Sequence, residues 1–302
     1  MKFIDPRIDF AFRKIFGSEE TKEVLKSFVE AVLGLEGDKK LKEIHIADPY
    51  QLPKLQLLKI TILDVKCTDH RGITYLVEMQ IKRTEAFLKR VQYNLAKSYS
   101  GQITSGADFP KLNQVIGITI TDFTLFPRFS HYHSCHTTRE TLTNEEYLSD
   151  IVYYFLELSK FDKKEKELVN SIDKWSYFLK MAGELEEIPE ALKEPPYKTA
   201  FEVAMVSRMT RDEYELYDNA AMQITDHKGS LEFAHKEGFQ EGMEKGKEEG
   251  REKGREEGME KGMERKSVEI ANNLIKLNMP LEQISQVTGL PIEEIEKLIQ
   301  SN

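Results

Sequence analysis

The stretch ILDVKCTDHRGITYLVEMQIKR, residues 62–83, decides the fold of this chain. Two apolar runs flank the polar segment DHRG at residues 69–72, whose glycine suits a tight turn. This pattern predicts two β-strands joined as a hairpin. Charged or amide side chains interrupt both runs, at Asp64, Glu78, Gln80 and Lys82.

The second run is predicted to carry its polar side chains on one face. Residues two apart in a strand share a face and lie about 6 to 7 Å apart. Glu78, Gln80 and Lys82 are therefore expected to point the same way, and Met79 and Ile81 to point into the opposite packing layer.

A hairpin around this turn brings Asp64 close to Glu78, with Lys66 on the same face as Asp64. Carboxylates that face one another repel and favour a bound cation. Oxygen ligands suit Mg²⁺ or Mn²⁺, which polarises a phosphate and activates a water molecule for hydrolysis. A solvated strand face is the alternative interpretation. An uncompensated carboxylate inside an apolar run is costly, which favours the metal site.

The segments around the hairpin predict a mixed α/β domain. Apolar residues recur at helical spacing in residues 21–33 and 85–103, whereas residues 55–65, 74–81 and 113–120 are strand-like. A helix between strands suggests a partly parallel sheet.

The next hundred residues are expected to add strands and then helices. Residues 128–160 are predicted to add two strands, although the segment DIVYYFLEL within them also fits a helix. Residues 162–228 are predicted to be helical, with Trp175 and Phe178 on one face and Pro195-Pro196 as a break.

Composition narrows the class of protein. The 302 residues carry a net charge of −9, which argues against a uniformly basic DNA-coating protein but permits a local basic groove. Two cysteines, Cys67 and Cys135, form neither a disulfide framework nor a zinc motif. The N-terminus lacks the pattern of a signal peptide, and no apolar run is long enough to span a membrane. A reduced, cytoplasmic setting is expected.

A four-residue repeat, EGFQEGMEKGKEEGREKGREEGMEKGM, occupies residues 237–263. Glycine stands at every fourth position, and each glycine costs a helix about 1 kcal/mol relative to alanine. One interpretation is a glycine-striped helix that packs closely against a second copy of the chain. The other is a solvated linker that frays.

The last segment, residues 267–302, is predicted to be a small helical unit that resembles a helix-turn-helix. Its final helix carries Glu293, Glu294 and Glu296 beside a single Lys297. These acidic side chains repel phosphate backbones, so a contact with protein or a capping role is favoured over reading of the DNA major groove.

Several segments in this order resemble the Rpn-type recombination-promoting nucleases and transposases of the PD-(D/E)XK nuclease superfamily. They are the opening IDFAFRKIFG, the pair DVKCTDHRG and VEMQ, then RVQYNLAKSYSGQI, VIGITITDF, FLELSKF, the glycine repeat and the closing TGLPIEEIEKL. The resemblance covers nearly the whole chain. It implies an α/β restriction-endonuclease-like αβββαβ core and metal-dependent cleavage of DNA, with Mg²⁺ or Mn²⁺ as cofactor.

The resemblance also assigns roles to the hairpin residues. Asp64 matches the first metal-binding acid and Glu78 the second. Gln80 stands where the superfamily commonly has lysine, so it can orient a water molecule but is a poor base. Lys82 is the candidate to supply the missing positive charge, and Lys66 is a weaker one.

Two further acids are auxiliary candidates, each with a plainer alternative. Asp9 lies in the opening segment, where it helps to position the active-site strands or simply starts a helix. Glu30 lies on the first predicted helix, as an auxiliary acid or as a surface charge. Residues expected to contact DNA, or to form only a solvated helix face, are Arg83, Lys89, Arg90, Tyr93 and Lys97.

The predicted organisation is a nuclease-like domain at residues 1–160, a helical region at 161–230, the repeat at 231–266 and a helical unit at 267–302. The predicted function is a metal-dependent DNA endonuclease linked to recombination or mobile elements, assembled as a homo-oligomer through the repeat. A catalytically silent DNA- or protein-binding descendant is the alternative. A transposase that also joins strands uses the same acids.

Overall fold

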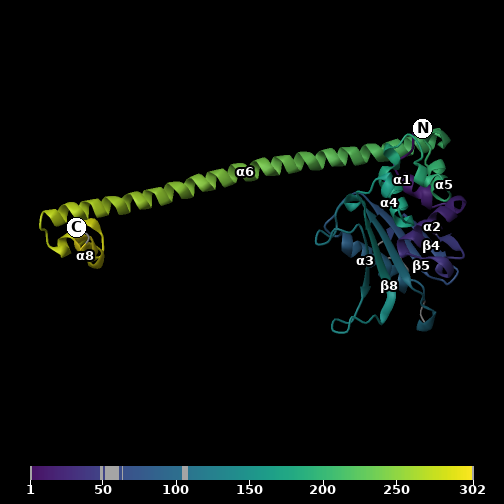
Figure 1. Cartoon of the computed structure of the whole chain (residues 1–302), viewed down its shortest axis with the longest axis horizontal. Coiled ribbons are helices and arrows are strands. Elements are labelled where there is room, and N and C mark those ends of the chain that lie inside the picture. Colours follow the sequence, from purple (N-terminus) through teal and green to yellow (C-terminus); the bar gives the residue numbers. More distant parts are fainter. Residues whose placement is uncertain (1, 48–49, 52–60, 63, 104–107, 301–302) are drawn as a thin grey trace. The chain divides into compact units, whose positions relative to one another are not determined.

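The computed structural model of the chain describes residues 2–47, 50–51, 61–62, 64–103 and 108–300. The chain divides into two compact units, residues 1–224 and 225–302. The first is a mixed α/β fold built on a central sheet, and the second is helical (Figure 1).

The strands are β1 (Ile44–Ala47), β2 (Tyr50–Gln51), β3 (Thr61–Ile62), β4 (Val65–Asp69), β5 (Thr74–Gln80), β6 (Val115–Thr121), β7 (His133–Thr138) and β8 (Leu148–Glu157). Six of them form one mixed sheet in the order β1-β4-β5-β6-β8-β7. The inner strands β5, β6 and β8 run parallel, whereas β1, β4 and β7 pair antiparallel with their neighbours. Strands β2 and β3 form a separate pair.

The helices are α1 (Asp9–Phe16), α2 (Lys22–Leu33), α3 (Phe87–Ser100), α4 (Ser171–Met181), α5 (Tyr197–Val203), α6 (Arg211–Lys276), α7 (Leu281–Thr288) and α8 (Ile292–Gln300). Buried side chains of α1, α2, α4 and α5 share one core with one face of the sheet. Helix α3 packs on the other face, where Leu95 lies so close to Gly117 of β6 that a Cβ atom there would be 2.7 Å from it. The sheet is therefore covered by helices on both faces.

The predicted helices and the central strand are confirmed. Helix α2 ends at Gly34, whose φ of 64° is the left-handed conformation that glycine adopts without strain. Helix α3 falls within the predicted residues 85–103. Every residue of β6 is buried, as a continuous apolar run between two helical layers requires.

Of the strand predicted at residues 55–65, the structure describes Thr61–Ile62 as β3 and Val65 as the first residue of β4. Residues 52–60 and 63 lie outside the described part of the chain, and the strand that pairs with β5 begins at Val65 and ends at Asp69. The turn fixes this register, because the carboxylate of Asp69 accepts hydrogen bonds from the backbone N–H groups of Arg71 and Ile73. Gly72 completes the turn with a φ of 84°.

The segment 128–160 does form two strands, and DIVYYFLEL belongs to β8 except for Leu158, which begins a short 3-10 turn. Beyond it, helices α4 and α5 join the core that α1 and α2 build. The ring of Trp175 on α4 lies 5.7 Å from that of Phe16 and 6.0 Å from that of Phe28, measured between centroids. The helices after residue 160 therefore complete the same hydrophobic core.

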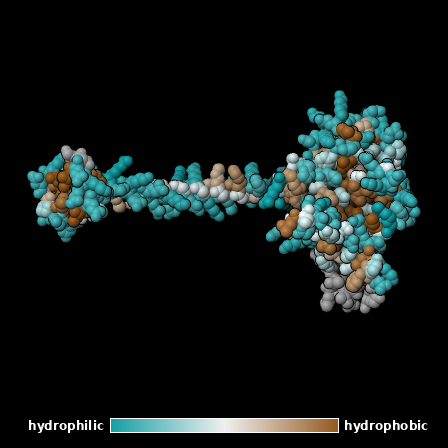
Figure 2. Space-filling model, turned by 60° about the horizontal axis from the view of Figure 1, so that its bottom comes forward, coloured by the Kyte–Doolittle hydropathy of each residue, from teal (hydrophilic) through white to brown (hydrophobic). Residues whose placement is uncertain are grey.

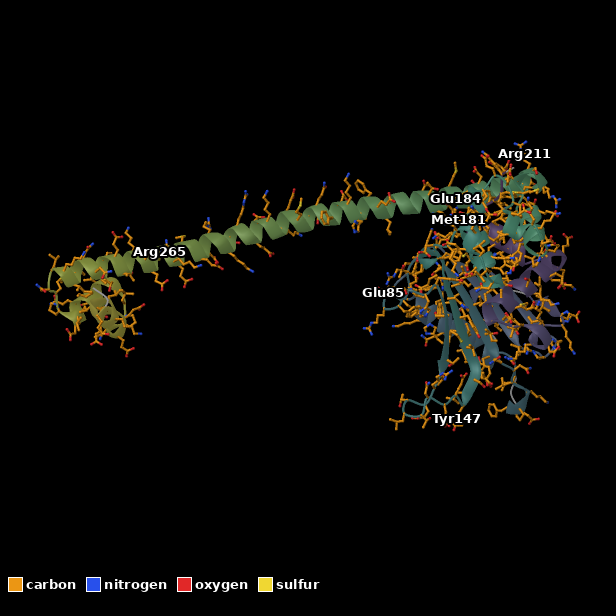
Figure 3. The ribbon with its side chains drawn as sticks, in the orientation of Figure 1. Glu85, Tyr147, Met181, Glu184, Arg211 and Arg265 are labelled. Atoms are coloured by element: carbon orange, nitrogen blue, oxygen red, sulfur yellow. The ribbon has the colours of Figure 1, made fainter. Side chains whose placement is uncertain are left out.

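The glycine repeat is helical and forms part of α6, which runs for 66 residues. Side chains project from all around this helix between Arg211 and Arg265 (Figure 3). Its surface is mainly hydrophilic, interrupted by paler and apolar positions (Figure 2). The exposed apolar side chains of the repeat are Phe239, Met243, Met259 and Met263.

The end of α6 packs with α7 and α8 around a small core of its own. Ala271, Ile284 and Ile295 are fully buried there, and Gly289 ends α7 in the left-handed conformation. Among the helices that the structure describes, none combines the length and the apolar character needed to cross a membrane.

Candidate active site

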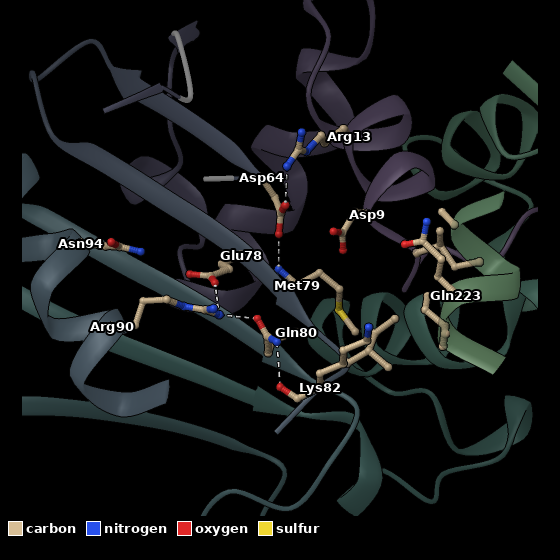
Figure 4. A pocket seen from close by; sticks show the side chains of 14 residues that line it. Asp9, Arg13, Asp64, Glu78, Met79, Gln80, Lys82, Arg90, Asn94 and Gln223 are labelled. Atoms are coloured by element: carbon tan, nitrogen blue, oxygen red, sulfur yellow. Dashed lines mark hydrogen bonds and ion pairs between the residues drawn. The ribbon is translucent and has the colours of Figure 1, made fainter. Parts of the chain in front are cut away.

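The β4–β5 hairpin brings the two predicted metal-binding acids together. Val65 and Val77 form the last pair at the open end of the hairpin, and Asp64 and Glu78 follow directly beyond it. Both carboxylates line one pocket of about 460 Å³ (Figure 4). Their side chains are only 9% and 15% exposed. The hairpin therefore places two largely buried carboxylates side by side.

Asp64 is held by a main-chain and a side-chain donor. The backbone N–H of Met79 donates to its Oδ2 at 2.9 Å, and Nη2 of Arg13 on α1 donates to its Oδ1 at 3.2 Å. Burial raises the pKa of the Asp64 carboxyl, and the negative charge of Asp9 raises it further. The hydrogen bond from Met79 and the positive charge of Arg13 lower this pKa. Desolvation outweighs the partners, so the carboxylate is undercompensated.

Glu78 shows the same imbalance. Burial raises the pKa of its carboxyl, Arg90 opposes the shift, and the charges of Asp64 and Asp9 add to it. Two neighbouring acids whose pKa values are both raised, despite Arg13 and Arg90 beside them, form an environment that a cation would stabilise.

The residues that could hold a metal ion are this pair. In the described part of the chain, no three His, Cys, Asp or Glu side chains are grouped closely enough to form a ready-made metal site. Asp9 also lines the pocket, but its side chain is exposed. Mg²⁺ is commonly held by one or two carboxylates, with water and substrate phosphates as the remaining ligands. The donor set of Asp64 and Glu78 fits such an ion.

Gln80 lies beside Glu78 on the same face of β5, and both accept hydrogen bonds from one guanidinium. Nη2 of Arg90 on α3 donates to Oε1 of Glu78 at 2.7 Å and also to Oε1 of Gln80. The amide Nε2 of Gln80 donates to the backbone carbonyl of Lys82 at 2.7 Å. Gln80 is thus oriented at both ends, and the side chain of Lys82 lines the same pocket.

The other predicted auxiliary residues lie in different places. Oε1 of Glu30 accepts the backbone N–H of Leu41 at 2.9 Å and so anchors the chain between α2 and β1. Lys66 lies in the middle of β4, between its strand partners Ala47 and Leu76, and does not line the pocket.

The predicted DNA-contacting residues divide into an outer and an inner group. Arg83, Lys89 and Tyr93 are exposed on or just before α3, and the ammonium of Lys97 lies 5.9 Å from the centre of the Tyr93 ring. Arg90 instead turns into the pocket, because the rotation of α3 on the sheet places this position over Glu78 and Gln80 (Figure 4).

Sequence reasoning missed three polar pocket residues. Arg13 comes from α1, Asn94 from α3, and Gln223 from the first part of α6, a segment more than a hundred residues further along the chain. Asn94 is buried in the helix, and its Oδ1 has no hydrogen-bond partner among the described residues. A buried amide on an otherwise amphipathic helix was the one available signal, since polar side chains are rarely buried without a partner.

Residues 6–234 match the profile of the PD-(D/E)XK nuclease family transposases. The chain belongs to this family. The match includes the sheet, the helices on both of its faces and the pocket, and it ends within α6. No curated protein and no solved structure gives a significant match. The family relationship inferred from the sequence is confirmed, and the six-stranded mixed sheet is consistent with its fold.

Proposed function

We propose that this chain is a metal-dependent DNA endonuclease whose metal ligands are Asp64 and Glu78. The observation that carries the proposal is the convergence of these two buried carboxylates, both with raised pKa values, on one pocket. Membership of a nuclease family supports the same reaction. The element order α2-β1-β4-β5-α3-β6 supports an αβββαβ core around the site.

The ion, Mg²⁺ or Mn²⁺, supplies the positive charge that polarises the scissile phosphate and activates water. The protein contributes the geometry. Met79 fixes one oxygen of Asp64 through its backbone N–H, which leaves the carboxylate aimed into the pocket. Gln80, held by Arg90 and by the carbonyl of Lys82, orients the attacking water by hydrogen bonding.

DNA is proposed to approach over the exposed side of α3. Lys89 and Arg83 supply positive charge for backbone phosphates, and Tyr93 presents its ring beside the ammonium of Lys97. Lys82 is a further candidate to contact the scissile phosphate, because its side chain lines the pocket. The overall charge of −9 makes such a local basic surface necessary for binding DNA.

The repeat in α6 is proposed to pair two copies of the chain, which suits an enzyme that cuts both strands. Nothing lies within 4 Å of a Cβ added at Gly238 through Gly262, so this surface is open for a close helix partner. Replacing Gly246, Gly250 and Gly254 together by alanine is expected to weaken self-association measured by sedimentation of the full-length chain. An unchanged monomer–dimer balance would contradict the pairing.

The function is tested by incubating supercoiled plasmid with the purified chain and Mg²⁺ or Mn²⁺. Wild type is expected to nick or linearise the plasmid. Asp64→Asn, which keeps the shape of the side chain, is expected to lose at least roughly 10³-fold in rate, because a metal ligand is missing. The matched control is Glu23→Gln, which removes an exposed acid of α2.

Two outcomes of this assay would favour a different function. Intact plasmid with wild type under both metals favours a silent DNA- or protein-binding member of the fold. Joined ends among the products, scored on a gel beside free ends, favour strand transfer over hydrolysis.

A further inference from the structure

Arg90 occupies the position next to both catalytic candidates on β5. Its Nη2 donates to Oε1 of Glu78 at 2.7 Å and to Oε1 of Gln80. The side chain of Glu78 is 15% exposed and that of Arg90 is 40% exposed. Arg90 is therefore more exposed than the carboxylate that it contacts, and both residues line the pocket (Figure 4).

The hydrogen-bonding capacity of this region is not fully used by the protein. Both contacts of Arg90 to β5 use Nη2, whereas its Nε is buried and has no partner among the described residues. One helical turn further along α3, Oδ1 of Asn94 is also buried and unpartnered, and it lines the same pocket. Native proteins seldom leave buried polar atoms unpaired, so these atoms point to a ligand that completes the site.

We propose that Arg90 competes with the metal ion for Glu78 and, once displaced, binds the scissile phosphate. This inference rests on the proposed nuclease function. Before the metal binds, Arg90 pairs with Glu78 and Arg13 pairs with Asp64, so each acid is held in place by a partly compensating guanidinium without a metal ion. Glu78 could exchange the guanidinium of Arg90 for a divalent cation, which would supply the compensating charge and would repel Arg90.

The chemistry of the displaced side chain suits phosphate. A guanidinium presents paired N–H donors that match two phosphate oxygens, and it stays charged at any physiological pH. Arg90 already reaches the oxygens of Glu78 and Gln80, so a small rotation suffices to face a substrate at the pocket mouth. The contact of Lys82 with Gln80 is through its backbone carbonyl. Arg90, whose guanidinium contacts the side chain of Gln80 directly, supplies the positive charge that Gln80 lacks.

Metal binding tests the competition without relying on catalysis. Full-length wild type, Arg90→Met and Arg90→Lys are titrated with MnCl₂ in a calorimeter. Arg90→Met is expected to bind Mn²⁺ about tenfold more tightly, because a hydrogen-bonded cation no longer holds Glu78. Arg90→Lys is expected to show a smaller gain. Lys111→Met, which removes an exposed positive charge elsewhere, is expected to match wild type.

Cleavage at saturating Mn²⁺ tests the phosphate contact. The single-turnover rate of Arg90→Met is expected to fall roughly 10²–10³-fold, as for the loss of one transition-state donor. Arg90→Lys, which keeps a charge but not the fork of donors, is expected to retain part of the rate. Tighter metal binding together with slower cleavage is a combination that loss of a merely structural contact does not produce.

The metal titration and the cleavage assay each have an outcome that would contradict the proposal. A Mn²⁺ affinity of Arg90→Met equal to or weaker than that of Lys111→Met overturns the competition. A wild-type cleavage rate in Arg90→Met at saturating metal overturns the phosphate contact. A wild type that binds Mn²⁺ but cuts no DNA overturns the proposed function and the phosphate contact with it, while the titration still decides the competition. If Arg90→Met fails to fold, Arg90→Lys is used to test both the competition for Glu78 and the phosphate contact.

Discussion

The pocket at the β4–β5 hairpin and the repeat in α6 use the same charged residue types under opposite conditions. In the pocket, a few acids are buried and their partners only partly compensate them. Along the repeat, many glutamates, lysines and arginines are exposed on a single helix. Burial and not abundance decides how strongly a charge acts, because water screens the exposed ones. The electrostatic chemistry of this chain is therefore concentrated in its compact α/β unit.

The largest effect is expected where a buried ion pair is broken. Glu157 is 1% exposed; it accepts Nζ of Lys160 at 2.6 Å and the backbone N–H groups of Leu125 and Phe126. Glu157→Ala is expected to lower the free energy of unfolding by about 3–5 kcal/mol, because Lys160 is left buried without its counter-charge. Urea denaturation measures the loss. The control Glu248→Ala, on the exposed repeat, is expected to change the same quantity by less than about 0.5 kcal/mol.

Equal losses of unfolding free energy in Glu157→Ala and Glu248→Ala would contradict the idea that burial makes the charges of the α/β unit more important than those of the repeat. The comparison uses the same substitution in both, so a difference in residue type cannot account for the result.

The pH dependence of stability is expected to distinguish the well-partnered Asp69 from the acids of the pocket. Burial alone would raise the pKa of Asp69, but hydrogen bonds from Arg71, Tyr75 and the backbone of Ile73 outweigh it and lower the pKa. The stability that this carboxylate contributes is present above its unfolded pKa of about 4 and is lost as the pH falls through the lower folded value.

Asp69→Asn is therefore expected to cost about 2 kcal/mol at pH 7, as for a hydrogen-bonded charged group, and much less near pH 3. Urea midpoints at the two pH values measure this. A cost that is the same at both would show that shape, and not charge, makes Asp69 important in the turn.

The stability linked to the pocket acids is expected to change with pH in the opposite direction. Burial raises the pKa of Asp64, so the stability linked to its protonated form is complete below the unfolded pKa and is lost as the pH rises through the folded one. At pH 7 the charged carboxylate weakens the fold. Asp64→Asn keeps an acceptor for the N–H of Met79 and is expected to gain on the order of 1 kcal/mol without metal.

Thermal unfolding at pH 7, with and without Mn²⁺, measures this gain. The ion is expected to stabilise wild type more than the variant, since it binds only the folded carboxylates. A variant that is less stable than wild type in metal-free buffer would show that the Arg13 ion pair outweighs desolvation.

The sequence predicted what local patterning determines. Alternating residues and a glycine turn are enough to pair Asp64 with Glu78, and a continuous β-branched run is enough to identify β6 as buried. It did not predict that the Asp69 carboxylate holds the turn by accepting the N–H groups of Arg71 and Ile73, because these bonds depend on the folded backbone. Nor did it place Arg90 in the pocket. The rotation of α3 on the sheet decides that, and it depends on contacts such as that of Leu95 with Gly117, distant in sequence.

The smallest effect compares two glycines whose surroundings differ only in backbone conformation. Gly250 lies inside α6, and Gly34 ends α2 with a φ of 64°; nothing lies within 4 Å of a Cβ added at either position. Sterics are thus equal, and the backbone alone sets the sign. At concentrations where the chain is monomeric, Gly250→Ala is expected to stabilise the helix by about 1 kcal/mol, whereas Gly34→Ala is expected to destabilise α2 by about the same amount, because alanine disfavours the left-handed region. Amide hydrogen exchange of each helix measures the change as about a fivefold difference in protection factor, higher for Gly250→Ala and lower for Gly34→Ala. Reduced protection around Gly250→Ala in the monomeric chain would contradict this expectation, whereas a reduction confined to concentrations at which the chain pairs would support the proposed close packing of two copies.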